Sequence, residues 1–354
     1  MQGVLDQFAQ TVRVAAGAKR ALRLRGGGSK DFYGQALEGE VLDTRGYAGV
    51  VSYEPSELVI TARCGTLLVE LEGILKQANQ FLPFEPPSFG PAATVGGCVA
   101  AGLSGPRRAT SGALRDYLLG TKLIDGRGNV LAFGGQVMKN VAGYDVSRLL
   151  AGSLGTLGLI AEASIKVLPR PPVETTLWLK MTEERALEAL NRWAGQPLPM
   201  SASAWHDGEL GVRLSGAEAG VRAAAGKIGG EDVSADRAAA FWEGMREQSD
   251  PFFSGDEPLW RIAVPPAAPP LRLPGRQLIE WGGGLRWLKS PAEARVIREA
   301  AQRARGHATL FRAERRVGEA FSPLDEVQMR LHRELKAAFD PAGIFNPGRL
   351  YAQL

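Results

Sequence analysis

Cysteine is scarce in this chain, because Cys64 and Cys98 are the only two among 354 residues. An iron-sulfur cluster needs about four cysteine ligands, so the chain cannot hold one by itself. A disulfide framework of the kind found in small secreted proteins also needs more cysteines than this. We therefore expect two buried free thiols in a protein that works in a reducing compartment.

Long apolar runs are also absent. No uninterrupted stretch reaches the roughly 20 residues that a membrane-spanning helix needs. The N-terminal residues carry an acid at Asp6 and lack the apolar segment of a secretory signal. The sequence thus predicts a cytoplasmic protein that associates with the inner membrane at most peripherally, through a larger complex.

Histidine is rare too, with only His206, His307 and His332, which lie far apart in the sequence. None belongs to an H-x-x-H or H-E-x-x-H pattern, so the spacing predicts no metal site. Such histidines more often pack or face solvent than take part in catalysis. His307, which precedes an apolar strand, is the one weak catalytic candidate, and the catalytic residues are otherwise unknown.

The charge balance argues against a nucleic-acid-binding protein. The 42 basic and 38 acidic residues give a net charge of +4, and both signs are dispersed along the chain. Nucleic-acid-binding proteins usually concentrate basic residues on one face. With 45% hydrophobic and 23% charged residues the composition is that of an ordinary globular protein, and 354 residues fit two domains.

Hydrophobic spacing indicates mixed α and β structure in the first half. Apolar residues recur at helical spacing from Val4 to Ala15, and residues 21–25 are predicted to form a strand that leads into Gly26. The other predicted elements are a strand at 58–63, a helix at 67–78, a hairpin of 118–124 with 130–133, and a strand at 159–168.

A proline-rich stretch, 169–172, marks the predicted domain boundary, because proline lacks the N–H that a continuing strand needs. We assign residues 1–172 to the first domain, 173–322 to a second, smaller α+β domain, and 323–354 to a C-terminal helix and tail. Within the second domain the pattern predicts strands at 175–180, 202–205 and 211–214, helices at 183–193 and 218–228, and proline-rich connectors. A last helix is predicted through Val327, Leu331, Leu335 and Ala338.

Glycine-dense loops are the most distinctive feature of the first half: Arg25–Lys30, Thr94–Gly97 with Gly102–Gly105, and Gly152–Gly158. Consecutive glycines let a backbone approach an anion closely. A single loop of this kind is more often just a turn. Neither G-x-x-x-x-G-K-[ST] nor a strand-linked G-x-G-x-x-G occurs, which argues against a P-loop ATPase and a Rossmann dehydrogenase. The pattern favours a long anionic ligand held by several loops of one domain.

These loops resemble, in their order and their sequence motifs, those of the vanillyl-alcohol oxidase, or PCMH-type, family of FAD-binding proteins. The motifs GGG[ST], A-T-[IV]-G-G and G-S-x-G-T-L-G follow one another along the chain. The chain is similar in particular to the FAD-binding subunits of bacterial glycolate oxidases. Segments that carry this likeness are 86–97, 105–108, 137–145, 277–289, 306–309 and 345–351. The resemblance implies an α+β fold: a PCMH-type FAD-binding domain of two α/β subdomains, a reduced α+β cap domain, and a tail that returns to the flavin domain.

The resemblance also implies which residues contact FAD. They fall in four segments, namely Leu24, Arg25, Gly26, Gly27, Gly28, Ser29 and Lys30; Ser88, Pro91, Thr94, Val95, Gly96 and Gly97; Gly102, Leu103, Ser104 and Gly105; and Gly155, Thr156, Leu157, Gly158 and Ile160. Asn346 in the tail is a weaker candidate. Lys139 and Arg115 are cations that would offset phosphate charge or form salt bridges within the fold. The loop 25–34 contains no histidine, the residue to which flavin is commonly linked in this family, so the FAD is expected to be non-covalent.

The function that the resemblance implies is that of a subunit in a multisubunit glycolate oxidase, which converts the small 2-hydroxy acid glycolate into glyoxylate. The histidine and acid cluster of the larger family members is missing here, so the oxidation is assigned to a larger paralogous FAD-binding catalytic subunit. An iron-sulfur subunit would accept the electrons, and FAD in this chain would relay them or support assembly. Two alternatives stay open: a structural partner without FAD, and a stand-alone FAD-dependent 2-hydroxy acid oxidoreductase.

Overall fold

The structure, a computed structural model, describes residues 1–135, 145–314 and 318–354. Lys139 and most of the segment 137–145 therefore lie outside the described residues. Within the described ranges, no helix is both long and apolar enough to cross a membrane.

The N-terminal half alternates short helices and strands, as the hydrophobic spacing predicted. Its elements are α1 (Gln2–Gly17), β1 (Leu22–Arg25), β2 (Glu40–Asp43), β3 (Val50–Glu54), β4 (Val59–Arg63), α2 (Leu68–Gln77), β5 (Gln80–Phe81), α3 (Val95–Ala101), α4 (Arg108–Ser111), α5 (Leu114–Tyr117), β6 (Leu118–Ile124), β7 (Val130–Gly134), α6 (Val146–Leu150), β8 (Leu159–Lys166) and β9 (Leu168–Pro169). The predicted helix at the N-terminus, the strands near 21–25 and 58–63, and the hairpin of β6 with β7 are confirmed.

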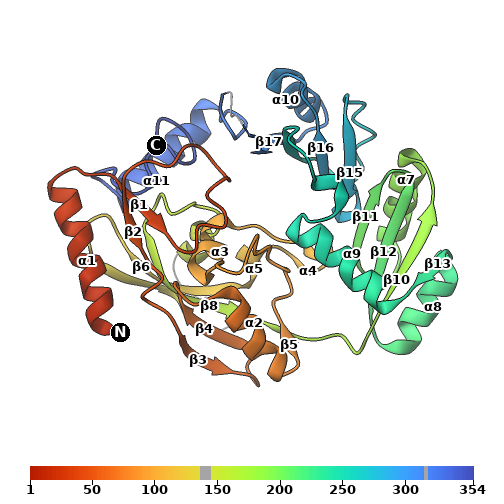
Figure 1. The fold of residues 1–354 in the computed structure, drawn as a ribbon, viewed down its shortest axis with the longest axis horizontal. Helices are drawn as coiled ribbons and strands as arrows, with labels where there is room; N and C mark the ends of the chain where they lie inside the picture. The colour runs from red at the N-terminus through yellow and green to blue at the C-terminus, as the bar shows by residue number, and fades with distance from the viewer. Residues whose placement is uncertain (136–144, 315–317) are drawn as a thin grey trace.

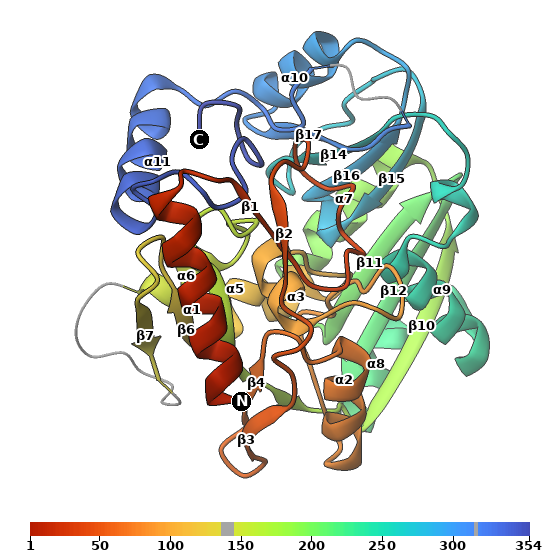
Figure 2. The same ribbon diagram turned by 60° about the vertical axis from the view of Figure 1, so that its left-hand side comes forward.

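Besides the short antiparallel pair of β5 with β9, two sheets organise the described part of this half. β1 and β2 form a parallel pair, and a separate antiparallel sheet has the order β3-β4-β8-β6-β7. One core lies between the five-stranded sheet and α2 and α3, with Leu71, Val99 and Ile165 among its buried side chains. A second core lies under α1, whose buried residues Leu5, Phe8 and Val12 share one helical face. The sheet is thus covered by helices on both sides (Figures 1 and 2).

The C-terminal half is built on a different sheet. Its elements are β10 (Val173–Lys180), α7 (Glu183–Ala194), β11 (Met200–His206), β12 (Glu209–Gly216), α8 (Glu218–Ile228), β13 (Glu231–Val233), α9 (Ala235–Glu247), η1 (Pro251–Phe253), β14 (Leu259–Ala263), β15 (Arg276–Glu280), η2 (Trp281–Gly283), β16 (Leu285–Lys289), α10 (Ala294–Arg303), β17 (His307–Arg312) and α11 (Glu326–Phe339). The chain crosses to this sheet between β9 and β10, where the boundary at residues 172 and 173 is proposed.

This second sheet, which we call the cap sheet, is antiparallel, with the order β13-β10-β12-β11-β15-β16-β14-β17. It is wider than the sequence suggested, because we predicted no strands at the positions of β14, β15 and β16. Its outer face packs against α7, α8 and α10. Its inner face meets the N-terminal half through one continuous apolar cluster that includes Leu103, Leu154, Trp287 and Phe311. Figure 1 shows the two halves side by side, with α4 and α9 near their junction.

The C-terminal tail returns to the N-terminal half, as expected. Asp325 caps the N-terminus of α11, because its carboxylate accepts from the N–H of Gln328 at 2.7 Å. After the helix, Phe345 forms an isolated parallel bridge with Leu22 of β1. Figure 2 shows α11 and the C-terminus beside the C-terminal end of α1.

Candidate functional site

A groove lined by glycines lies between β1, α3 and the loop that precedes β8. It consists of two adjoining cavities of about 60 and 80 Å³. Both are lined by Leu24, Arg25, Gly26, Gly97, Ala100, Leu154 and Asn346. We call this feature the glycine groove. It brings together segments that are more than 300 residues apart in the chain, from Leu24 to Asn346.

Glycine is required in the groove because the loops pack backbone to backbone. A Cβ atom on Gly27 would lie 1.5 Å from the carbonyl oxygen of Ala92, and one on Gly26 would lie 2.2 Å from Thr94 Oγ1. Gly28 has a φ of +74°, a conformation that glycine adopts without strain. The first loop therefore fits against the second only because it has no side chains there.

Thr94 orders the second loop. Its side chain caps α3 and accepts from the N–H of Gly97 at 3.3 Å. Gly96 lies against Cys64, since a Cβ at this position would be 2.6 Å from the Cβ of Cys64. Burial raises the pKa of both Cys64 and Cys98 to about 12, so both remain protonated thiols, as expected for inert buried cysteines.

Positive charge is concentrated at the first loop. Lys30 lines the groove, and its Nζ donates to the carbonyl oxygen of Ser88 at 3.1 Å. Burial lowers the pKa of Lys30, which indicates that desolvation opposes its charge. Arg25 is held by Asp31 at 3.0 Å, and Arg349 donates to the Asp31 carbonyl at 3.0 Å. An anion in the groove would compensate the desolvated charge of Lys30.

Asn346 fixes the tail to two of the loops. The backbone N–H of Leu24 donates to Asn346 Oδ1 at 2.8 Å, and Asn346 Nδ2 donates to the Leu154 carbonyl at 2.6 Å. Both polar atoms of the side chain are thus used within the fold. Asn346 has a φ of +42°, in the left-handed region that asparagine tolerates better than most residues. Asn346 therefore lies in the groove because it holds the tail against the loops that contain Leu24 and Leu154.

The structure gathers most of the sequence-predicted residues in the glycine groove. Those that line it are Leu24, Arg25, Gly26, Gly27, Gly28, Ser29, Lys30, Thr94, Gly96, Gly97, Gly155, Gly158 and Ile160. The groove also contains Thr44, Cys64, Ala100, Ala101, Leu159 and Arg349, which were not among the predicted contact residues. Thr44 and Cys64 directly follow β2 and β4, Ala100 and Ala101 end α3, Leu159 starts β8 and Arg349 lies in the tail, so only the fold brings them together.

The remaining predicted residues lie away from the groove lining. Leu103, Ser104 and Gly105 line a cavity of about 20 Å³ at the junction with the cap sheet, and Thr156 and Leu157 line one of about 250 Å³ beside α11. Val95 is buried in the core, whereas Pro91 is exposed. Ser88 touches the site through its carbonyl, and Gly102 packs against Gly152.

The histidines are not part of the groove. His307 starts β17, opposite Ala263, and its pKa is lowered by burial and by the charges of Arg261 and Arg108. His206 lies at the end of β11 and His332 on α11. Within the described residues, no three His, Cys, Asp or Glu side chains gather in a way that would hold a metal ion. Arg115 is exposed and lies 4.0 Å from Asp116.

Comparison with known proteins identifies the family. The chain is 49% identical over 354 residues to the glycolate oxidase subunit GlcE of Escherichia coli K12, a match that covers 100% of this chain and 98% of that protein. The chain belongs to the GlcE family. Its residues 4–134 also match the family model of an FAD binding domain, and residues 319–350 match the C-terminal domain of FAD linked oxidases. FAD is therefore the cofactor of this fold, and the chain is a subunit of an FAD-dependent oxidoreductase.

Two further proteins are similar to part of this chain or to its fold. The glycolate oxidase subunit GlcD of Bacillus subtilis 168 is 32% identical over 128 residues, which cover 36% of this chain and 27% of that protein. Alkyldihydroxyacetonephosphate synthase has the same fold, with a TM-score of 0.69 and 15% identity over 96% of this chain and 74% of that one. GlcE and GlcD are both named as subunits of glycolate oxidase, which supports a multisubunit complex with a GlcD-like partner.

Proposed function

We propose that this chain is an FAD-binding subunit of a multisubunit glycolate oxidase that converts glycolate into glyoxylate. The observation that carries the proposal is the full-length 49% identity to GlcE, which extends over the glycine loops, the cap sheet and the tail alike. The reaction removes two electrons and two protons from the substrate. Bound FAD supplies the two-electron chemistry for which side chains have no equivalent.

The glycine groove suits a dinucleotide cofactor. Its loops are glycine where a Cβ would collide with the opposing backbone, and Lys30 places a desolvated cation beside them. We assign Gly26, Gly27 and Gly28 to the pyrophosphate, with Ser29 and Lys30 beside it, because backbone N–H groups and a cation together bind such an anion. Gly155, Gly158 and Ile160 form the other end of the groove. The loop 25–34 contains no histidine, which supports non-covalent binding.

The proposed division of labour assigns glycolate oxidation to a larger, GlcD-like subunit. This chain then relays electrons or stabilises the assembly, and a separate iron-sulfur subunit accepts the electrons, because Cys64 and Cys98 are too few for a cluster. Association with the inner membrane is proposed to be peripheral, through the complex. The comparisons favour this proposal over a structural partner without FAD and over a stand-alone oxidoreductase, since the full-length relative is itself an oxidase subunit.

Reconstitution tests the proposal. The purified chain, a GlcD-like flavoprotein and an iron-sulfur subunit are assayed alone and together for glycolate-dependent dye reduction. We expect little turnover by the isolated chain and full turnover only with all three proteins. Robust glycolate oxidation by the chain alone would show that it is a stand-alone enzyme, and undiminished activity of the other two without it would remove its role.

A further inference from the structure

A second polar cluster lies on the inner face of the cap sheet, at the junction with the N-terminal half. Its centre is Trp281, which follows β15 and is 8% exposed. The indole Nε1 donates to the carbonyl oxygen of Gly105 at 3.0 Å, so the ring spans the junction. Its φ of +55° is a strained conformation for an aromatic residue. The fold thus holds this ring in place at an energetic cost.

Two arginines from different parts of the chain stack on this ring. The guanidinium carbon of Arg108, from α4, lies 4.4 Å from the ring centroid, and that of Arg261, from β14, lies 5.2 Å from it. Along the ranges that the structure describes, neither guanidinium forms an ion pair within 4.0 Å or donates a side-chain hydrogen bond. Burial and the nearby charge of Arg261 lower the pKa of Arg108 to about 10. The charge of Arg115 also lowers the pKa of Arg108 and that of Asp116 raises it, so Asp116 offsets only part of the repulsion between the positive charges at this ring.

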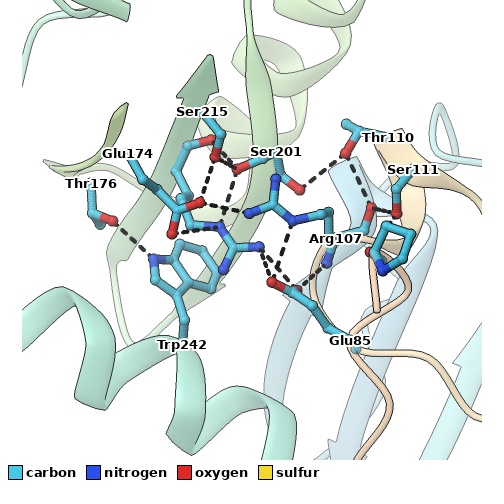
Figure 3. A network of polar contacts seen from close by, with 12 residues as sticks. Glu85, Arg107, Thr110, Ser111, Glu174, Thr176, Ser201, Ser215 and Trp242 are labelled. Carbon is cyan, nitrogen blue, oxygen red and sulfur yellow. Dashed lines mark hydrogen bonds and ion pairs between the residues drawn. The ribbon is translucent and has the colours of Figure 1, made fainter. Parts of the chain in front are cut away.

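Two nearby arginines at the same junction, unlike Arg108 and Arg261, form ion pairs with carboxylates of the chain. Arg107 donates to Glu174 at 2.6 Å and pairs with Glu85 at 3.4 Å, as Figure 3 shows. Arg213 pairs with Glu85 at 2.8 Å. Structural arginines here thus receive carboxylate partners from the chain itself. Arg108, the next residue after Arg107, has no carboxylate within ion-pair distance among the residues that the structure describes.

A buried acid lies on the same face of the sheet. Glu280, 3% exposed, precedes Trp281 and accepts from Trp287 Nε1 at 2.7 Å through one oxygen. Its other oxygen, Oε1, has no hydrogen-bond partner within the described ranges of the chain, and Glu280 and Arg261 both line the cavity of about 20 Å³. That cavity has room for about one water molecule or one small polar group. The cluster therefore offers both unpaired cations and an unpaired buried acid.

We propose that Arg108 and Arg261 form a binding site for the carboxylate of a small 2-hydroxy or 2-oxo acid, with Glu280 and His307 as its polar neighbours. Guanidinium groups match a carboxylate in geometry and charge, and stacking on the Trp281 ring restricts their positions before a ligand binds. A singly charged carboxylate suits the site better than a phosphate dianion, because Glu280 adds negative potential close to Arg261. The choice of these acids rests on the proposed function. The site itself does not require that this chain carries out the oxidation.

Direct binding to the purified full chain tests the site. Glycolate and glyoxylate are titrated by calorimetry at neutral pH and low salt, because salt screens such contacts. We expect saturable binding of these acids and a rise in the midpoint temperature of thermal unfolding when they are present. Arg108→Gln and Arg261→Gln should each weaken binding by about tenfold or more, since each removes a charge-assisted contact. Arg303→Gln is the matched control, because Arg303 is 71% exposed on α10 and far from Trp281 in sequence.

The outcomes separate this proposal from that of the flavin subunit. Flavin content and circular dichroism are measured on every sample, and Arg261→Lys, which keeps the charge, should retain more binding than Arg261→Gln. A wild-type chain that holds FAD but binds none of the acids overturns the carboxylate site alone. Equal binding by all variants, or tighter binding of inorganic phosphate than of the acids, overturns it as well. A colourless chain that still binds the acids contradicts only the assignment of FAD.

Discussion

Gly97 is the residue at which the groove assignment can be tested with least disturbance of the fold. It lines both cavities, and a Cβ there would touch only Thr94 Oγ1, at 3.3 Å. Gly27, by contrast, tolerates no Cβ because Ala92 would lie 1.5 Å away, so its substitution would confuse folding with binding. This difference determines the choice of variant.

Gly97→Asp is expected to reduce FAD retention strongly while the chain still folds. The new carboxylate would face the pyrophosphate across the groove, where like charges repel. The ratio of flavin to protein after gel filtration measures the effect. Gly195→Asp is the matched control, because Gly195 ends α7 with ordinary φ and its nearest contact is Arg192 O at 3.8 Å. A folded Gly97→Asp variant with wild-type flavin content would refute the assignment of this loop.

Glu280 is the residue at which pH is expected to affect stability. Burial raises the pKa of Glu280 to about 7 against an ordinary value of 4.5, although Trp287 and the charges of Arg261 and Arg213 oppose the shift and Glu85 adds to it. Because the folded pKa lies above the unfolded one, the stabilising contribution is complete below about pH 4.5 and is lost as pH rises through about 7. A shift of this size corresponds to roughly 3 kcal/mol.

Glu280→Gln should therefore be more stable than the wild type at pH 8 and close to it at pH 5. Glutamine keeps the shape and the acceptor for Trp287 but has no charge to bury. Urea midpoints of both proteins at the two pH values measure the difference. A gap between the two proteins that does not change with pH would contradict the account of Glu280.

At the scale of elements, the junction between the two halves is held by ion pairs between strands and loops. Figure 3 shows Glu85 and Arg107 from the N-terminal half facing Glu174 of β10 and Ser201 of β11. Glu85 accepts from the backbone N–H of Arg107 at 2.9 Å and pairs with Arg213 of β12 at 2.8 Å. Burial alone would raise the pKa of Glu85, but Arg213 and Arg107 outweigh it and the pKa is lowered.

Glu85→Gln is expected to lower the free energy of unfolding by about 2–4 kcal/mol, because it leaves two buried guanidiniums short of a carboxylate. Glu218→Gln, on the exposed face of α8, is the control and should change it by less than about 1 kcal/mol. Denaturant titrations at pH 7 compare the two. The contribution of Glu85 should also disappear as pH falls through its lowered pKa. A loss for Glu85→Gln as small as that of the control, below about 1 kcal/mol, would show that the junction network is dispensable.

Some helices and strands of the second half could be predicted from the sequence, and others could not. The strands and helices of residues 173–228 follow clear hydrophobic spacing, and they were predicted correctly. β14, β15 and β16 were not predicted, because each is only five residues long, a proline-rich connector separates β14 from β15, and a glycine-rich turn separates β15 from β16. β16 is buried along its whole length, including Arg286 and Lys289, so it lacks the polar and apolar alternation of a half-exposed strand.

At the scale of the whole molecule, the fold brings together residues that sequence spacing cannot connect. The glycine loops could be predicted from their composition, because close packing of two backbones requires glycines at neighbouring positions in the sequence. The roles of Asn346 and Arg349 depend on the return of the tail across the molecule to Leu24 and Asp31. The pairing of Arg108 with Arg261 on Trp281 likewise exists only once the cap sheet meets the N-terminal half. Long-range proximity of this kind leaves no local pattern.

Flavin content of the purified full chain is the most direct test of the central claim. The account predicts a yellow protein with FAD in near-stoichiometric amount, all of which is released into the supernatant by acid precipitation because no covalent bond holds it. The measurement needs only the visible spectrum before and after precipitation, together with the protein concentration. A correctly folded chain without flavin, even after incubation with excess FAD, would contradict the claim that this chain is an FAD-binding subunit, and colour that stays with the precipitate would contradict non-covalent binding.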